Sequence, residues 1–82
     1  MKDYFIRWRM LYKVINMKSN INVWIAKNEM SKKEVASKLG VSQTVLSRWI
    51  NNHSMPSVEN LFRLARILNC KADDLYEIRE GN

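Results

Sequence analysis

Residues 32–50 constrain the fold of this chain more than any other segment, and they read KKEVASKLGVSQTVLSRWI. Apolar residues recur at helical spacing on both sides of Gly40, which can end a helix in the left-handed conformation at no steric cost. The pattern predicts two short helices that meet steeply across a turn of about three or four residues. The small Ala36 would let them approach closely. The apolar positions of the pair are Val35, Leu39, Val41, Leu46 and Trp49.

Serine residues stand where both helices of this pair should begin. Ser31 and Glu34 form a capping-box pattern, in which the serine oxygen accepts from a backbone amide and the glutamate reaches back to the serine amide. Ser42 can cap the second helix through its hydroxyl. Asn52 is placed to end that helix, a position usually held by glycine. The sequence therefore predicts a start and a stop for both helices.

The second helix, expected at 42–50, has two opposite faces when it is drawn at about 100° per residue. One arc is apolar and must face a core; it contains Val45, Leu46, Trp49 and Ile50. The other arc carries amide, hydroxyl and guanidinium groups, which hydrogen-bond to base edges in the major groove of DNA. A face that is merely solvated is usually rich in Lys and Glu, whereas this arc has one arginine and no acid. Its members are Gln43, Thr44, Ser47, Arg48 and Asn51.

The charge of the chain favours a polyanionic partner. The net charge is +6 over 82 residues, the length of one small domain, so nucleic acid is the first candidate and an anionic membrane surface the second. The acidic residues Asp73, Asp74, Glu77 and Glu80 cluster near the C-terminus, which should point away from the anion-binding face. No apolar run reaches the roughly 18 residues of a membrane span, and charges interrupt the N-terminus. We therefore expect a cytoplasmic protein.

The residues that could carry catalysis or bind a metal lack partners in the sequence. Cys70 is the sole cysteine, which excludes an internal disulfide and a multi-cysteine zinc site. Its place at the end of a helical pattern predicts a small core residue rather than a redox group. His53 is the sole histidine and has no ligand or catalytic partner at useful spacing. We expect no enzyme activity, cofactor, metal or small-molecule ligand.

Further helices are expected on both sides of the pair. A helix capped by Asn20 should end near Asn28, a residue type that tolerates the left-handed conformation. A helix capped by Ser57 should follow the pair, and a short turn that packs Leu75 should come last. The apolar stripes are Ile21, Trp24 and Ile25 in the first of these helices, and Val58, Leu61, Phe62, Leu64, Ala65 and Leu68 in the second.

The first sixteen residues allow more than one interpretation. Apolar residues at every second position from Tyr4 to Val14 predict a strand, and residues 76–80 alternate in the same way. A membrane-surface segment is disfavoured because the apolar residues show no clean helical moment. We expect the segment to pair with the strand near Ile78 in its own chain or across a two-fold axis, and to help build a dimer. A helix is the alternative, and it would group Phe5, Trp8, Tyr12 and Ile15.

From Asn20 to Tyr76 the chain resembles the Cro/CI-type (XRE) helix-turn-helix family of bacterial and phage transcription regulators. The resemblance rests on the stretch A-x-x-L-G-V-S, the S-R-W after it, the P-S opening of the next helix and the final D-D-L-Y. It implies a mainly α fold, a compact lambda-repressor-like bundle of about five helices, with a possible short strand pair at its ends. The chain is then divided into an extension at 1–19, a DNA-binding domain at 20–78 and an acidic tail at 79–82.

The resemblance implies that the helix at 42–50 reads double-stranded DNA. Arg48 suits guanine, Gln43 suits adenine, and Val45 is placed to touch a thymine methyl. The residues expected to read bases are Gln43, Thr44, Ser47 and Arg48. The residues expected to contact the DNA backbone are Ser31, Lys32, Lys33, Ser42, Asn51, Asn52, His53 and Ser54.

The predicted function is a sequence-specific transcriptional regulator, a repressor that acts as a homodimer. The alternative is an antitoxin or protein-interaction module whose N-terminal segment binds a partner protein. Three residues depart from the family pattern: Lys32 replaces a frequent glutamine, Ile50 a frequent acidic residue and Asn52 a frequent glycine. The lysine changes the expected backbone contact, whereas the other two affect the turn that follows the helix.

Overall fold

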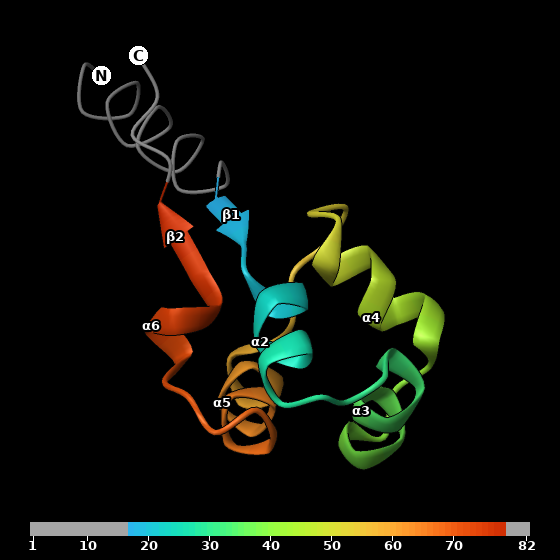
Figure 1. Cartoon of the computed structure of the whole chain (residues 1–82). Helices are drawn as coiled ribbons and strands as arrows, with labels where there is room; N and C mark the ends of the chain where they lie inside the picture. Colours follow the sequence, from blue (N-terminus) through green and yellow to red (C-terminus); the bar gives the residue numbers. More distant parts are fainter. Residues whose placement is uncertain (1–16, 79–82) are drawn as a thin grey trace, which may run out of the picture.

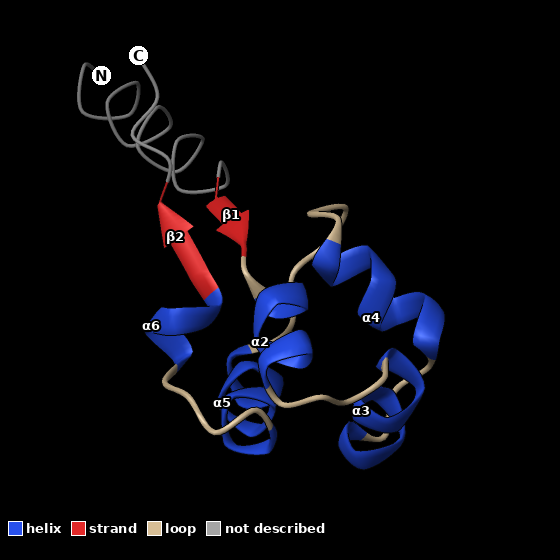
Figure 2. Ribbon diagram, in the orientation of Figure 1, coloured by secondary structure: helices blue, strands red, loops and turns tan. Residues whose placement is uncertain are grey.

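The computed structural model describes residues 17–78, which form five helices and one two-stranded sheet (Figures 1 and 2). In chain order the elements are β1 (Met17–Ser19), α2 (Ile21–Lys27), α3 (Lys32–Leu39), α4 (Gln43–Ile50), α5 (Val58–Ile67), α6 (Ala72–Leu75) and β2 (Tyr76–Ile78). Figure 1 shows α3 and α4 on one side of the bundle and the two strands with α6 on the other. The mainly α fold class predicted from the sequence, with its strand pair, is confirmed.

The two strands join the ends of the described chain. They run antiparallel, with Met17 opposite Ile78 and Lys18 opposite Glu77. The Lys18 ammonium lies 4.0 Å from the Glu77 carboxylate, a cross-strand ion pair between exposed side chains. The partner of Ile78 in its own chain is thus Met17, a residue outside the alternating run 4–14. The strand predicted over that run lies outside the described residues.

The core is apolar, and every helix contributes to it. Ala36 is 2 % exposed, in agreement with the prediction that a close helix contact requires a small residue there. Trp49 is 5 % exposed, so the apolar side of α4 faces inward. Among residues 17–78, no buried residue is polar or charged by type. The buried residues are Ile21, Ile25, Val35, Ala36, Leu39, Leu46, Trp49, Leu64, Ala65, Leu68, Leu75 and Tyr76.

Serine side chains begin three of the helices. Ser31, Ser42 and Ser57 each accept a hydrogen bond from the backbone N–H three residues later, at 3.0, 3.1 and 3.1 Å. These caps are confirmed, and each satisfies an amide that has no partner within its helix. The Glu34 carboxylate accepts no hydrogen bond from the Ser31 backbone N–H, although both residues are described, so this half of the predicted capping box is wrong.

Asn20 precedes α2 but does not cap it with its side chain, so this prediction is also wrong. Its backbone N–H donates instead to the Leu75 carbonyl at 2.8 Å, which ties the start of α2 to the end of α6. The hydroxyl of Ser19 accepts from the Ile21 N–H at 3.4 Å. Residue 20 is therefore held by a contact with the far end of the domain, which local sequence cannot reveal.

Four helices end in the same way, with one residue in the left-handed conformation. The next N–H then donates to the carbonyl five residues back, at 2.8–3.1 Å, as in a Schellman motif. The predicted stops at Gly40 and Asn52 are confirmed. The predicted end of the helix near Asn28 is confirmed, but the left-handed residue is Glu29, because the φ of Asn28 is −89°. The four residues and their φ angles are Glu29 at 55°, Gly40 at 82°, Asn52 at 62° and Asn69 at 57°.

Asn28 serves instead as a link between two helix ends. Its side-chain amide donates to the carbonyls of Trp24 and Leu68, both at 2.8 Å. Its side-chain oxygen accepts from Asn69 at 3.3 Å. The amide thus satisfies carbonyls at the C-terminal ends of α2 and α5, which explains why its own backbone need not adopt the left-handed conformation.

The apolar stripe predicted for α5 is only partly buried. Leu64, Ala65 and Leu68 lie in the core, but Val58 is 72 % exposed and Phe62 is 60 % exposed. The apolar arc of α5 is wider than the side that its neighbours α3 and α6 cover, so part of it faces solvent. In residues 17–78 no helix is long and apolar enough to cross a membrane.

Candidate nucleic-acid interface

The corner between α3 and α4 positions the candidate interface. Gly40 ends α3 and Ser42 begins α4, so that only one residue, the half-buried Val41, lies between them and packs against the core. Leu46 and Trp49 hold the inner side of α4 in the core. Because the inner side is fixed in this way, the opposite side of α4 faces outward along the edge of the bundle (Figure 1).

The predicted base-reading residues share the outer side of α4. Gln43, Thr44 and Arg48 are exposed, and Ser47 is half-buried. Positions one, two, five and six of a helix fall within about one and a half turns, so these side chains form a continuous polar surface. The surface offers an amide, two hydroxyls and a guanidinium, and it contains no carboxylate.

The buried arc of α4 is narrower than the sequence predicts. Val45 is 36 % exposed rather than in the core, and Ile50 is half-buried. Both residues lie at the margins of the buried arc. This arc is the side of α4 that contacts α2 and α3. Val45 consequently presents its methyl groups beside the polar surface, an apolar contact next to hydrogen-bonding groups.

Arg48 is held at the C-terminal end of this surface. One guanidinium nitrogen, Nη2, donates to the His53 carbonyl at 3.4 Å, and the His53 N–H donates to the Arg48 carbonyl at 2.8 Å. The loop and the arginine therefore position each other. A guanidinium has five N–H donors, so most remain free for a ligand. The sequence gives no signal for this contact, because the loop folds back only through the left-handed Asn52.

The predicted backbone-contacting residues form two groups around α4. In the loop after the helix, Asn51, Asn52 and His53 are exposed and Ser54 is half-buried. At the N-terminal ends of α3 and α4 lie Ser31, Lys32, Lys33 and Ser42, all of them exposed. The loop directly follows α4, and α3 packs against α4 across the corner, so both groups lie on segments that adjoin this helix.

The N-terminal ends of α3 and α4 suit an anion. Ser31 and Ser42 use their hydroxyl oxygens as acceptors for helix amides, so their hydroxyl protons remain available to a phosphate. Amides in the first turn of each helix also lack helical partners and favour negative charge. Lys32 and Lys33 add positive charge, which Glu34 in the same turn partly offsets.

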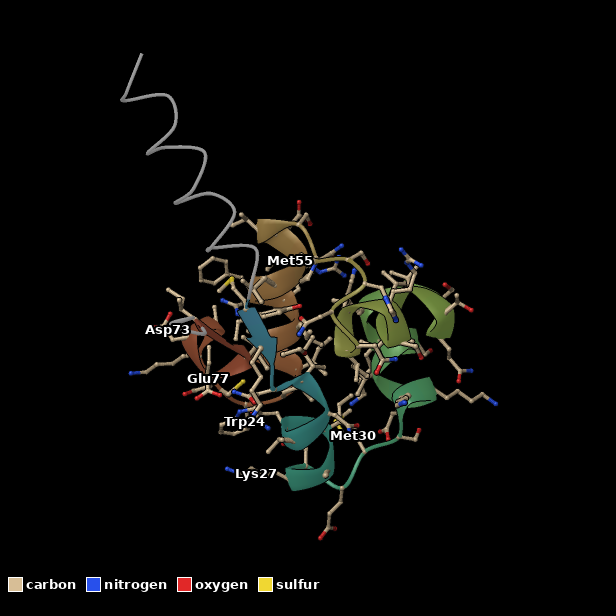
Figure 3. The ribbon with its side chains drawn as sticks, turned by 90° about the horizontal axis from the view of Figure 1, so that it is seen from above. Trp24, Lys27, Met30, Met55, Asp73 and Glu77 are labelled. Atoms are coloured by element: carbon tan, nitrogen blue, oxygen red, sulfur yellow. The ribbon has the colours of Figure 1, made fainter. Side chains whose placement is uncertain are left out.

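The acidic residues near the C-terminus lie on another side of the molecule. Figure 3 shows Asp73 and Glu77 on the opposite side from α3 and α4. Glu77 is also paired with Lys18. These two carboxylates therefore lie away from the candidate interface, whereas Glu80, the last of the four acidic residues, lies outside the described residues.

Cys70 and the potential metal ligands show no arrangement that suggests catalysis or metal binding in the described residues. Burial raises the pKa of the Cys70 thiol and the nearby Asp74 carboxylate raises it further, which disfavours the thiolate, the reactive form of cysteine. Cys70 is half-buried and packs against the core, close to the core position that the sequence predicts. The described residues contain no group of three side chains suited to hold a metal ion.

Two short helices crossing at a glycine corner, with an outward polar helix that carries no acid, define a helix-turn-helix domain. A family model described as helix-turn-helix matches residues 24–75, which include the whole candidate interface. The chain therefore belongs to the helix-turn-helix family of the Cro/CI (XRE) type, as its sequence motifs indicate.

One solved structure gives independent support for the fold. The chain is similar to the crystal structure of "a putative DNA-binding protein from Bacteroides fragilis", with 31 % sequence identity and a TM-score of 0.70. The similarity covers 74 % of this chain and 98 % of that chain. The search of curated proteins found no match to the chain.

Proposed function

We propose that this protein is a sequence-specific DNA-binding transcriptional regulator, and that α4 enters the major groove. One observation carries the proposal. The outer side of α4 is polar, exposed and free of acid, while Leu46 and Trp49 fix its inner side in the core. Family membership and the structural similarity support the same conclusion.

Different residues of α4 recognise different bases. Arg48 donates two hydrogen bonds to O6 and N7 of a guanine, and Gln43 pairs with an adenine. Thr44 and Ser47 donate or accept hydrogen bonds beside them. Val45 contacts a thymine methyl, a role that its 36 % exposure permits.

The residues around α4 grip the DNA backbone and set the register of the helix in the groove. Those at the N-terminal ends of the two helices are Ser31, Lys32, Lys33 and Ser42, and those in the following loop are Asn51, Asn52, His53 and Ser54. Loss of one cationic contact should weaken binding to all sequences alike, because phosphates carry no sequence information.

The regulator acts as a repressor and as a homodimer in the cytoplasm. A small domain that covers an operator blocks access to it without needing a further surface. Operators of this motif commonly contain two half-sites about one helical turn apart, which requires two copies of the domain on one side of the duplex. Residues 1–16 help to build this dimer.

The second candidate function is an antitoxin or protein-interaction module. It is favoured by the apolar residues that alternate from Tyr4 to Val14, a pattern that a protein partner would bury. In that case DNA binding would be secondary. A toxin gene beside the gene for this protein, together with co-purification of its product, would favour this alternative.

Selection of bound sites from a pool of random DNA tests the proposal. The full chain should enrich one motif, and Gln43→Ala should lose the preference at one position of it. Asn22→Ala is the matched control, because Asn22 is an exposed amide on α2, outside the candidate interface; it should enrich the parent motif. A pool that shows no enrichment over the input would contradict sequence-specific binding.

A further inference from the structure

The loop that follows α4 (Figure 1) closes a ring of hydrogen bonds around Arg48. The backbone N–H of His53 donates to the Arg48 carbonyl at 2.8 Å, and the Ser54 N–H reaches the same carbonyl at 3.4 Å. In return, Nη2 of the Arg48 side chain donates to the His53 carbonyl at 3.4 Å. Both the backbone and the guanidinium of this arginine are therefore held by the backbone of the loop.

Asn52 determines whether this ring can form. Its φ is 62°, whereas the residue before it, Asn51, has a φ of −93°. A left-handed residue at the end of a helix turns the chain back, so that the next N–H reaches a carbonyl five residues earlier. Asparagine enters this conformation at low cost, alanine is strained there by its Cβ, and a β-branched residue is a clear outlier. Because Asn52 is exposed, its substitution can move the His53 carbonyl without disturbing the core.

The contact on the guanidinium matters because an arginine side chain is long and flexible. A free arginine loses rotamer freedom when it binds, whereas one that is already oriented loses less. Arg48 is exposed, and a single hydrogen bond of 3.4 Å holds it loosely in water. In a groove from which water is excluded the same hydrogen bond becomes stronger. A net hydrogen bond of this kind is worth about 2–10-fold in an equilibrium constant, so the loop can sharpen the choice of base without creating it.

The end of α5 has the same turn, with an alanine at the position that Arg48 holds in α4. Asn69 is exposed and has a φ of 57°, and the N–H of Cys70 donates to the Ala65 carbonyl at 2.9 Å. Ala65 has no side chain that could bind a base, and α5 lies outside the candidate interface. The chain thus offers two asparagine turns of similar geometry, of which the one at Asn52 holds a base-reading arginine.

We propose that Asn52 is a positioning residue for base readout, because its left-handed backbone places the His53 carbonyl that orients the Arg48 guanidinium toward guanine. The inference rests on the proposed function and deepens it, since it names a residue that sets specificity through another residue. The same loop is assigned to the DNA backbone, so a loop bound to phosphate also fixes Arg48. Contacts to the phosphates and to the base are thereby coupled through one turn.

Competition binding to two operators tests the inference. One operator is the selected site, and the other replaces the base pair at which Arg48→Ala relaxes the preference. The ratio of the two dissociation constants measures discrimination at that base pair, and a loss of affinity shared by all sequences leaves this ratio unchanged. Asn52→Val should lower the ratio about 2–10-fold, and Asn52→Ala should lower it less. Asn52→Gly should keep the parent ratio, because glycine adopts the left-handed conformation freely.

Asn69→Val is the matched control. It puts the same residue type at a φ of 57° and also removes the hydrogen bond to Asn28, so it should destabilise the fold in urea denaturation at least as much as Asn52→Val does. Its discrimination ratio should nevertheless equal that of the parent. All variants are compared at a temperature where circular dichroism shows them folded, and Asn52→Ala decides the question if Asn52→Val does not fold.

The double variant Arg48→Ala/Asn52→Val separates positioning from a general loss of structure. If Asn52 acts through Arg48, the double variant should discriminate as Arg48→Ala does, because both changes remove one shared contact. The inference is overturned if Asn52→Val and Asn52→Ala keep the parent ratio, if Asn52→Gly loses as much as Asn52→Val, if Asn69→Val lowers the ratio, or if the two losses add in the double variant.

Selection of bound sites by the parent separates this inference from the proposed function. If the parent enriches one motif but Arg48→Ala relaxes no position of it, the inference falls and sequence-specific binding stands. If the parent enriches no motif, the proposed function fails as well.

Discussion

Trp49→Ala should unfold much of this domain, although Trp49 belongs to the helix that we assign to DNA. The side chain is 5 % exposed and lies on the inner side of α4. A buried tryptophan removes about 200 Å² from water, which at about 25 cal/mol per Å² gives an upper value of about 5 kcal/mol. Substitutions of this kind cost about 3–5 kcal/mol. A domain of 82 residues has a total stability of only about 4–12 kcal/mol.

Urea denaturation followed by circular dichroism measures this loss. The slope should be about 1 kcal/mol per molar for so small a protein, so the midpoint should fall by about 3 M or more. Val45→Ala is the matched control on the same helix, because Val45 is already exposed, and it should cost less than about 1 kcal/mol. A Trp49→Ala variant that melts like the parent yet fails to bind DNA would place Trp49 on the DNA surface and refute this reasoning.

Three further predictions address the DNA contacts, a helix end and the N-terminal segment. Lys32→Ala should reduce the log–log salt slope of DNA binding by about one unit and keep the site preference. The control is Lys18→Ala, which breaks the ion pair with Glu77 and should leave the salt slope unchanged. An unchanged salt slope in both variants would remove Lys32 from the interface. Glu29→Gly should stabilise the fold by about 0.5–1 kcal/mol in thermal melts, because glycine relieves the strain of the left-handed backbone at φ 55°. A lower melting temperature in this variant would show that the glutamate side chain stabilises the turn. A chain that starts at Met17 should fold, sediment more as a monomer and bind a two-half-site operator less tightly; behaviour like the full chain would make residues 1–16 dispensable for the dimer.

The sequence predicts best where local chemistry decides the structure. The serine caps at Ser31, Ser42 and Ser57 and the glycine stop at Gly40 depend on residues within five positions, and all four are confirmed. The outward polar side of α4 follows from helical periodicity in the same way. These features place the expected base-reading residues on one surface before any tertiary contact is known.

The predictions fail where distant segments decide. The helix α2 ends near Asn28 as predicted, but the Asn28 amide donates to the Leu68 carbonyl, forty residues away, and the left-handed residue is Glu29 instead. Asn20 likewise contacts Leu75 instead of capping its helix. The exposure of Phe62 depends on how much of α5 the neighbouring helices cover. The spacing of apolar residues along the sequence carries no information about that coverage. The contact between Arg48 and the His53 carbonyl is local in the sequence, but it depends on the left-handed Asn52, which folds the loop back toward α4.

Binding of Arg48→Ala to a selected operator and to random DNA tests the central claim most directly. If α4 reads bases, the variant should lose about 1–3 kcal/mol on the selected site, lose the preference at one position and bind random DNA nearly as the parent does. Circular dichroism should show a folded variant, because Arg48 is exposed and makes one long hydrogen bond. Equal loss on the selected and random DNA would make Arg48 a phosphate contact and contradict the proposed readout.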